Sequence, residues 1–196
     1  VPHFLAAFTM GSVGELGRGF VDDLLQADAS NLASALIGGV IFNLSNILLS
    51  ASVSIAGMSV AFPLGVGLAL VLGVFINYFN APQGSPVFLF LGVLLVIVAI
   101  VFNAWAYKNM GKGGEQQKTK GIVIAIVAGI MMSFFFRFIA SSMDLQNFEC
   151  PEVGKMTPYT AMVIFSIGIF TSNFIFNTAA MRRPFVGTST SYGDYF

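Results

Sequence analysis

The sequence lacks charge over much of its length. From Leu32 to Tyr107, 76 consecutive residues contain no Asp, Glu, Lys, Arg or His. Only 9% of the 196 residues are charged and 56% are hydrophobic, whereas a water-soluble domain carries about 25% charged residues. At about 1.5 Å of helical rise per residue, the uncharged run is long enough for roughly three crossings of a hydrocarbon layer about 30 Å thick. The sequence therefore predicts a polytopic membrane protein.

Cysteine and histidine are almost absent as well. Cys150 is the only cysteine, which excludes an intramolecular disulfide and a zinc site or cluster built on cysteines. His3, the only histidine, lies beside the start of the given sequence and is interpreted as incidental rather than as a ligand. The formal net charge is zero, so nucleic acid is not expected as a partner. We predict no metal and no cofactor.

The apolar runs predict an all-α transmembrane bundle, because a β-barrel would need alternating strands of about ten residues. A first run, from Val1 to Gly14, would be only about 21 Å long as a helix and is too short to span. We therefore expect it to be half of a severed helix and the chain to be a fragment. Five complete spans of about 20 to 25 residues follow: Leu32 to Ala56, Val60 to Phe79, Val87 to Tyr107, Ile122 to Ser142 and Tyr159 to Met181.

The polar connections predict an orientation. A solvated linker is expected from Lys108 to Lys120, and acidic loops from Glu15 to Asn31, with a short interfacial helix, and from Met143 to Pro158. Alternate connections place six basic and two acidic residues on one side, against two basic and seven acidic residues on the other. Because basic residues are retained in the cytoplasm, residues 108–120 and 182–196 are predicted to be cytoplasmic. The predicted location of the protein is a bacterial inner (plasma) membrane.

Three spans carry small and polar residues at helical spacing, so that each span presents them on one face. Two interpretations remain open: the stripes line a path for a solute between helices, or they join the helices to one another. The stripes are Gly39, Asn43, Asn46 and Ser50; Gly129, Ser133, Arg137 and Ser141; and Ser166, Asn173 and Asn177.

Arg137 is the only charged residue within a predicted span. It lies roughly 7 to 8 Å from the end of its helix, so it can either snorkel to the interface or face a cavity. In the second span, Gly65, Ala69 and Gly73 have the spacing that allows close helix packing. Pro63 removes a backbone hydrogen bond there, which produces either a structural kink or an exposed carbonyl that binds a solute.

These considerations give a set of expected solute contacts. The segment from Pro63 to Gly67 is the candidate for a flexible gate. No catalytic residues are predicted, because the spans contain no His, Cys, Asp or Glu to do chemistry, and an enzyme is disfavoured for that reason. The predicted substrate-binding residues are Asn43, Asn46, Ser50, Phe62, Pro63, Gly67, Ser133, Arg137, Asn173 and Asn177.

Four short segments resemble the ureide permease family, which is close to the glucose/ribose porter family within the drug/metabolite transporter superfamily. They are Gly38-Gly39-Val40-Ile41-Phe42-Asn43-Leu44-Ser45-Asn46, Ala56-Gly57-Met58-Ser59-Val60, Phe75-Ile76-Asn77-Tyr78-Phe79 and Gly92-Val93. The start of the last span, Pro158-Tyr159-Thr160-Ala161, also looks like the family's seventh helix. The resemblance implies a ten-helix secondary transporter built from two inverted five-helix repeats.

On that resemblance, residues 1–107 form most of the first repeat, 108–120 the connector and 121–196 the start of the second repeat. The implied function is secondary-active transport of a small polar metabolite by alternating access. Sugar uptake, ureide or nucleobase uptake and metabolite export all remain open. The alternative function is that of a non-transporting membrane scaffold or assembly subunit. The expected partners are the lipid bilayer and the solute, and a homo-oligomer is left open.

Overall fold

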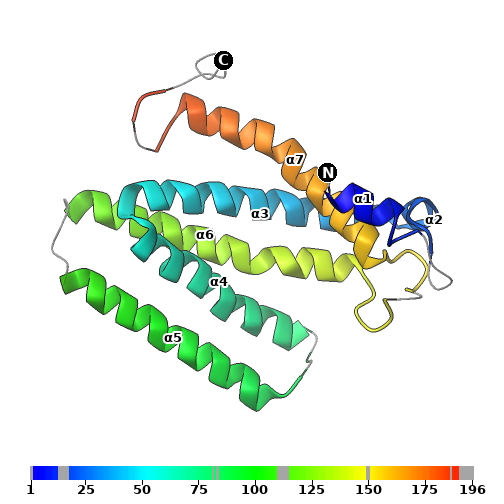
Figure 1. Ribbon diagram of the computed structural model, residues 1–196, viewed down its shortest axis with the longest axis horizontal. Helices are drawn as coiled ribbons and strands as arrows, with labels where there is room; N and C mark the ends of the chain where they lie inside the picture. The colour runs from blue at the N-terminus through cyan, green and yellow to red at the C-terminus, as the bar shows by residue number, and fades with distance from the viewer. Residues whose placement is uncertain are drawn as a thin grey trace. The chain divides into compact units, whose positions relative to one another are not determined.

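The computed structural model describes residues 2–12, 18–80, 82, 84–109, 115–148, 151–185 and 187–189, and this part of the chain is dominated by helices (Figure 1). A parallel bridge between Met143 and Met156 closes the loop between the last two helices. The helices are α1 Pro2–Phe8, α2 Phe20–Gln26, α3 Ala29–Ala56, α4 Met58–Asn80, α5 Pro86–Asn109, α6 Glu115–Ser142 and α7 Pro158–Arg182.

Five of these helices are long and apolar enough to cross a membrane, which confirms the predicted polytopic helical bundle. The stretches that qualify are Ala29–Ala56, Met58–Phe79, Pro86–Ala106, Thr119–Ser142 and Pro158–Arg182. Their lengths follow from the thickness of the hydrocarbon layer, since about 20 residues are needed to cross it as a helix.

The helix boundaries on both sides of the predicted linker from Lys108 to Lys120 differ from the predicted spans. The helix α6 begins at Glu115 rather than at Ile122, and α5 continues to Asn109. The residues from Glu115 to Lys118 are Glu, Gln, Gln and Lys, which are all good helix formers, so the apolar helix extends into this polar segment. A small part of the predicted linker, residues 110–114, lies outside the described residues.

A glycine separates the first two spans. Gly57 has a φ of +85°, a conformation that glycine adopts without steric cost, and its N–H donates to the carbonyl of Val53 at 2.9 Å. At the other end of α3, the N–H groups of Asn31 and Leu32 donate to the carbonyl of Asp28. Asp28 therefore directly precedes α3, whereas Asn31 lies inside it.

The chain divides into two compact units, and the division runs across α3, α6 and α7. The first unit consists of Val1–Phe42 and Phe135–Asn173, and the second of Asn43–Phe134 and Phe174–Phe196. The assignment of residues 1–107 and 121–196 to two repeats stays a prediction.

In the first unit, α3 and α7 cross at two glycines. A Cβ on Gly39 would overlap the carbonyl oxygen of Phe165, and a Cβ on Gly168 would overlap that of Leu36. Next to this crossing, the rings of Phe42, Phe135 and Phe165 pack together, with centroids 4.9, 5.4 and 6.0 Å apart. Such aromatic contacts stabilise beyond the area that they bury, so α3, α6 and α7 share one packed centre in this unit.

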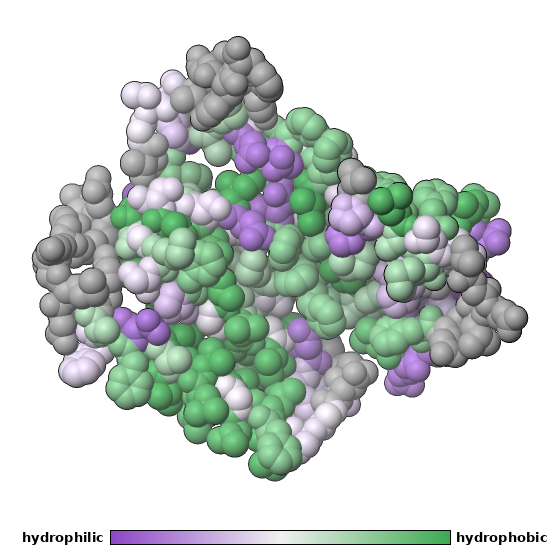
Figure 2. Space-filling view, in the orientation of Figure 1, coloured by the Kyte–Doolittle hydropathy of each residue, from purple (hydrophilic) through white to green (hydrophobic). Residues whose placement is uncertain are grey.

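In the second unit, α3, α4 and α6 pack through small residues, and α5 packs on α4 (Figure 1). Leu49, Ala61 and Ala128 form the buried apolar cluster. Only 6% of the apolar stretch of α5 is buried within the protein. The surface over α4 and α5 is largely hydrophobic (Figure 2). A lipid-facing helix is expected to have such a surface, because the bilayer interior does not favour polar side chains.

Candidate functional site

The predicted polar stripe of α3 changes from buried to exposed along the helix. Asn43 is 7% exposed, Asn46 is half-buried and Ser50 is exposed. Two neighbouring serines that the sequence analysis did not single out, Ser45 and Ser52, are fully buried. Ser52 donates a hydrogen bond to the carbonyl of Gly121 in α6 at 2.8 Å. Ser52 therefore joins two helices, as polar residues within membrane bundles commonly do.

The candidate gate in α4 is part of a continuous helix. Pro63 is half-buried inside α4 and supplies no N–H to the carbonyl of Ser59, one turn earlier. Phe62 is 45% exposed. Gly67 is buried, and a Cβ at this position would lie 2.8 Å from the Ile100 side chain of α5. The absence of a side chain at Gly67 therefore lets α4 and α5 approach each other.

The stripe of α6 contains one residue that forms a hydrogen bond within its own helix and one residue that is exposed. Ser133 is 2% exposed, and its hydroxyl donates to the carbonyl of Ile130 in the same helix at 2.7 Å. Arg137, one turn later, is exposed. In the part of the chain that the structure describes, no hydrogen bond or ion pair engages its guanidinium. Its position allows either a solute contact or an anchor at the interface.

The stripe of α7 is half-buried at Asn173 and at Asn177. Ser166 donates to the carbonyl of Met162 at 2.7 Å, and Ser172 donates to that of Ile169 at 3.1 Å. Bonds of this kind satisfy serine within its own helix. Asn173 and Asn177 stay predicted solute contacts.

The predicted contacts are divided between the two units. The first unit holds Arg137 and Asn173. The second unit holds Asn43, Asn46, Ser50, Phe62, Pro63, Gly67, Ser133 and Asn177. The glycines of two stripes have a different role, because Gly39 and Gly129 lie at helix crossings. The interpretation of a stripe as a joint between helices is therefore correct for these two positions, and the polar positions stay predicted solute contacts.

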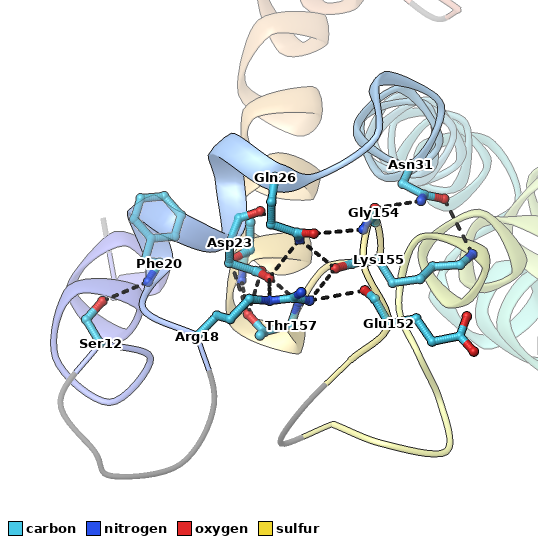
Figure 3. Close-up of polar contacts among 11 residues, drawn as sticks. Ser12, Arg18, Phe20, Asp23, Gln26, Asn31, Glu152, Gly154, Lys155 and Thr157 are labelled. Carbon is cyan, nitrogen blue, oxygen red and sulfur yellow. Dashed lines mark hydrogen bonds and ion pairs between the residues drawn. The ribbon is translucent and has the colours of Figure 1, made fainter.

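A polar cluster that the sequence analysis missed lies in the first unit, and we call it the polar clamp. It joins the segment around α2 to the loop between α6 and α7 (Figure 3). The clamp comprises the side chains of Arg18, Asp23, Gln26, Asn31, Lys155 and Thr157 and the backbone of Glu152 and Gly154.

Asp23 is the centre of the polar clamp. It is 0% exposed, and its carboxylate accepts from Arg18 Nε at 3.0 Å and from the N–H and hydroxyl of Thr157 at 2.8 and 3.0 Å. Gln26 Nε2 donates to the same carboxylate at 3.2 Å. A buried carboxylate needs such donors, because losing the partner of a buried ion pair costs about 3 to 5 kcal/mol.

The remaining contacts hold the α6–α7 loop against α2 and the start of α3. Arg18 Nη2 donates to the carbonyls of Glu152 and Lys155 at 3.2 and 2.9 Å. Gln26 accepts from the N–H of Gly154 at 2.7 Å and donates to the carbonyl of Lys155 at 2.9 Å. The carbonyl of Gly154 accepts from Asn31 Nδ2 at 2.8 Å. Each such bond contributes about 0.5 to 1.5 kcal/mol.

The backbone conformation at position 154 favours glycine. Its φ is +88°, and a Cβ would overlap the carboxylate of Asp28. The N–H of Asp28 donates to the carbonyl of Gly154 at 3.0 Å. One sequence signal points to the clamp. The side of the membrane predicted to be outside has seven acidic residues and only two basic residues, which are Arg18 and Lys155.

Asp144 lies at the start of the same loop. Its Oδ1 accepts from the N–H groups of Gln146 and Asn147 at 3.0 and 3.2 Å. These donors, Gln146 foremost, hold the pKa of Asp144 below its ordinary value of 3.8. Among the described residues, no group of three or more His, Cys, Asp or Glu side chains could hold a metal ion.

The chain is similar to plant ureide permeases over almost its whole length. Ureide permease 1 of Arabidopsis thaliana is 22% identical over 241 aligned residues, which cover 95% of this chain. Ureide permease 3 of the same plant is 21% identical over 215 aligned residues, also covering 95% of this chain. Ureide permease 4, again from that plant, is 22% identical over 250 aligned residues, covering 94% of this chain. The chain spans 62% of the length of each of these relatives.

No protein-family model matches the chain, and no solved structure matches it. The relatives that the chain resembles are named as permeases, and the five apolar helices are those of a multi-pass membrane protein.

Proposed function

We propose that this chain is part of a secondary transporter that moves a small polar metabolite across a membrane by alternating access. The observation that carries the proposal is the similarity to ureide permeases over 94% to 95% of the chain. The presence of asparagines inside apolar spans supports it, since polar groups in a membrane usually face neighbouring helices or a wet cavity.

The proposal includes the finer assignments that the resemblance implies. The chain would contribute helices to two inverted repeats of a drug/metabolite-type transporter, with a relation to glucose/ribose porters, in a bacterial inner membrane. The names of the relatives make ureides the first solutes to test, followed by nucleobases and sugars. The predicted contacts include Asn43 and Asn46 in the second unit and Asn173 in the first, each buried or half-buried inside a span.

Uptake into sealed vesicles tests this function directly. Vesicles that contain the full-length protein and matched vesicles without it are given a panel of labelled solutes: allantoin, uracil, glucose and ribose. We expect saturable uptake of at least one solute, and replacement of Asn43 by Ala should reduce its affinity. Saturable uptake that is identical in both vesicle preparations would contradict a transport function.

Arg137 provides a second test within the uptake assay. Lysine keeps the charge but loses the planar fork of donors that binds an anionic or strongly hydrogen-bonding group at two points. If the guanidinium contacts the solute, Arg137→Lys should raise the apparent KM for uptake without changing expression. If Arg137 is an anchor at the interface, lysine should serve equally well, because it snorkels as arginine does. An unchanged KM would remove Arg137 from the solute path.

The main rival is a membrane scaffold without transport, in which the stripes only join helices. Cysteines placed singly at Asn43, Asn46 and Asn173, in a Cys150→Ser background, distinguish the two functions. A transport path should allow water-soluble thiol reagents to modify these cysteines, and a packed joint should not. A cysteine at Ser52, which bonds α6, is the matched control that should stay unmodified in either case.

A further inference from the structure

Opening the polar clamp would expose a buried carboxylate and break its hydrogen bonds, which distinguishes the clamp from a gate. Asp23, at its centre, is 0% exposed and takes its donors from both sides of the joint: Arg18 precedes α2, and Thr157 precedes α7. Separation of the two sides would remove the hydrogen bonds of Thr157 from the carboxylate and those of Arg18 from the loop. A gate in an alternating transporter has to open readily, because the two states differ by only a few kcal/mol of free energy.

Residues close in sequence to the polar contacts take part in apolar packing on both sides of the joint. Phe20 of α2 is buried with Val163 of α7, and Phe20 also meets Phe8 edge-on, with ring centroids 5.0 Å apart. Ala35 of α3 is buried with Met156 of the α6–α7 loop. Segments that open easily have few buried apolar contacts, so this arrangement favours a joint that stays shut.

A backbone hydrogen bond also holds the joint closed. The bond from the N–H of Asp28 to the carbonyl of Gly154 joins the two segments at 3.0 Å without any side chain. Gly154 has a φ of +88° and leaves no room for a Cβ beside Asp28. All of these residues lie within the first compact unit.

From these contacts we propose that the polar clamp is a fixed joint that stays closed throughout the transport cycle. It holds the segment before α3 against the loop before α7. On this side of the membrane, the opening that gives the solute access therefore lies elsewhere in the protein. This inference rests on the proposed transport function for its role in a cycle. The rigidity of the joint does not depend on which solute is carried.

Spin labels measure that rigidity independently of transport. We would replace Cys150 by Ser and place labels at Leu25 and Val153, which are 80% and 88% exposed and take no part in the clamp's hydrogen bonds. In lipid nanodiscs, the full-length protein should give one narrow distance distribution, with and without each solute of the panel. Asp23→Asn should broaden that distribution. A second distance population in the parent protein would overturn the proposal.

Cross-linking tests the joint during transport. With Cys150 replaced by Ser, cysteines at the exposed positions Leu25 and Val153 are joined by a bifunctional thiol reagent whose length matches the measured spin-label distance. A fixed joint should leave uptake within about twofold of the untreated double-cysteine protein, and loss of uptake after cross-linking would overturn the proposal. If no solute is taken up before treatment, the proposed function fails, and the spin-label distances alone decide whether the joint is rigid.

Discussion

Gly65 of α4 and Gly129 of α6 bring two helix backbones into close contact: a Cβ on Gly129 would lie 2.5 Å from the carbonyl oxygen of Gly65. The obstacle is backbone, which cannot rotate away as a flexible side chain can. The predicted role of Gly65 in close packing is therefore confirmed. The partner, Gly129, belongs to a stripe whose role the sequence analysis had left open between a solute path and a helix joint.

Replacement of Gly129 by Ala should force α4 and α6 apart. We expect a loss of about 1 to 3 kcal/mol in the free energy of unfolding, as overpacking typically costs, measured by denaturant unfolding in mixed micelles. Gly92→Ala is the matched control, because a Cβ there meets nothing within 4 Å and alanine is the better helix former. Equal effects of the two substitutions would contradict the close crossing.

Asp23 and Asp22 are adjacent carboxylates that should respond very differently to substitution. Asp23→Asn keeps the shape but weakens the charge-assisted bonds to Arg18 and Thr157, so it should cost about 1 to 3 kcal/mol. Asp22 is exposed, and Asp22→Asn should stay within about 0.5 kcal/mol of the parent. Thermal unfolding in detergent, with tryptophan fluorescence or circular dichroism, compares the two variants.

Arg18→Ala extends this comparison to the other side of the ion pair. It leaves Asp23 buried without its cation, and we expect a cost of about 3 kcal/mol. A variant with both Arg18→Ala and Asp23→Asn should lose less than the sum of the two single effects, because the two residues share one interaction. Strict additivity would argue against the ion pair.

The stability of the α6–α7 loop should decrease at acid pH because of Asp144. The pKa of this group is lower in the folded chain than its ordinary value of 3.8, because the N–H groups of Gln146 and Asn147 donate to its carboxylate. A carboxyl group with a lowered folded-state pKa stabilises fully above the unfolded-state pKa, and this contribution is lost as the pH falls through the folded-state pKa.

The measurement compares the parent with Asp144→Asn, which keeps an oxygen acceptor but cannot ionise. The parent should unfold at a higher temperature than the variant at about pH 5, and the difference should shrink as the pH falls below the ordinary value of 3.8, since the unfolded chain then binds a proton before the folded chain does. A difference that stays constant over this range would show that the charge of Asp144 does not stabilise the loop.

The predicted orientation of the chain, which rests on the distribution of basic residues, can be tested at described positions. Single cysteines are placed at Val153 and at Thr188, both exposed, in a Cys150→Ser background. With residues 182–196 cytoplasmic, a membrane-impermeant thiol reagent applied to intact cells should modify the cysteine at 153 and spare that at 188. Permeabilised cells should show both modified. The reverse pattern in intact cells would invert the topology.

The five spans could be read from the sequence because the solvent for these segments is a hydrocarbon layer of nearly constant thickness. Backbone groups cannot be left without hydrogen bonds there, so each apolar run of about 20 residues forms a helix. The turn at Gly57 also follows from composition. The start of α6 was predicted less well, because Glu115 to Lys118 are polar but favour a helix, and polarity alone does not end one.

The polar clamp and the helix crossings were decided by the tertiary structure. Asp22 and Asp23 are identical in type, and only the approach of the α6–α7 loop, 134 residues later, buries one of them beside Thr157. Gly129 has the same local pattern as a residue lining a path, and only the position of Gly65 identifies it as a crossing. Local spacing places a residue on a helix face, but packing between distant segments determines what that face contacts.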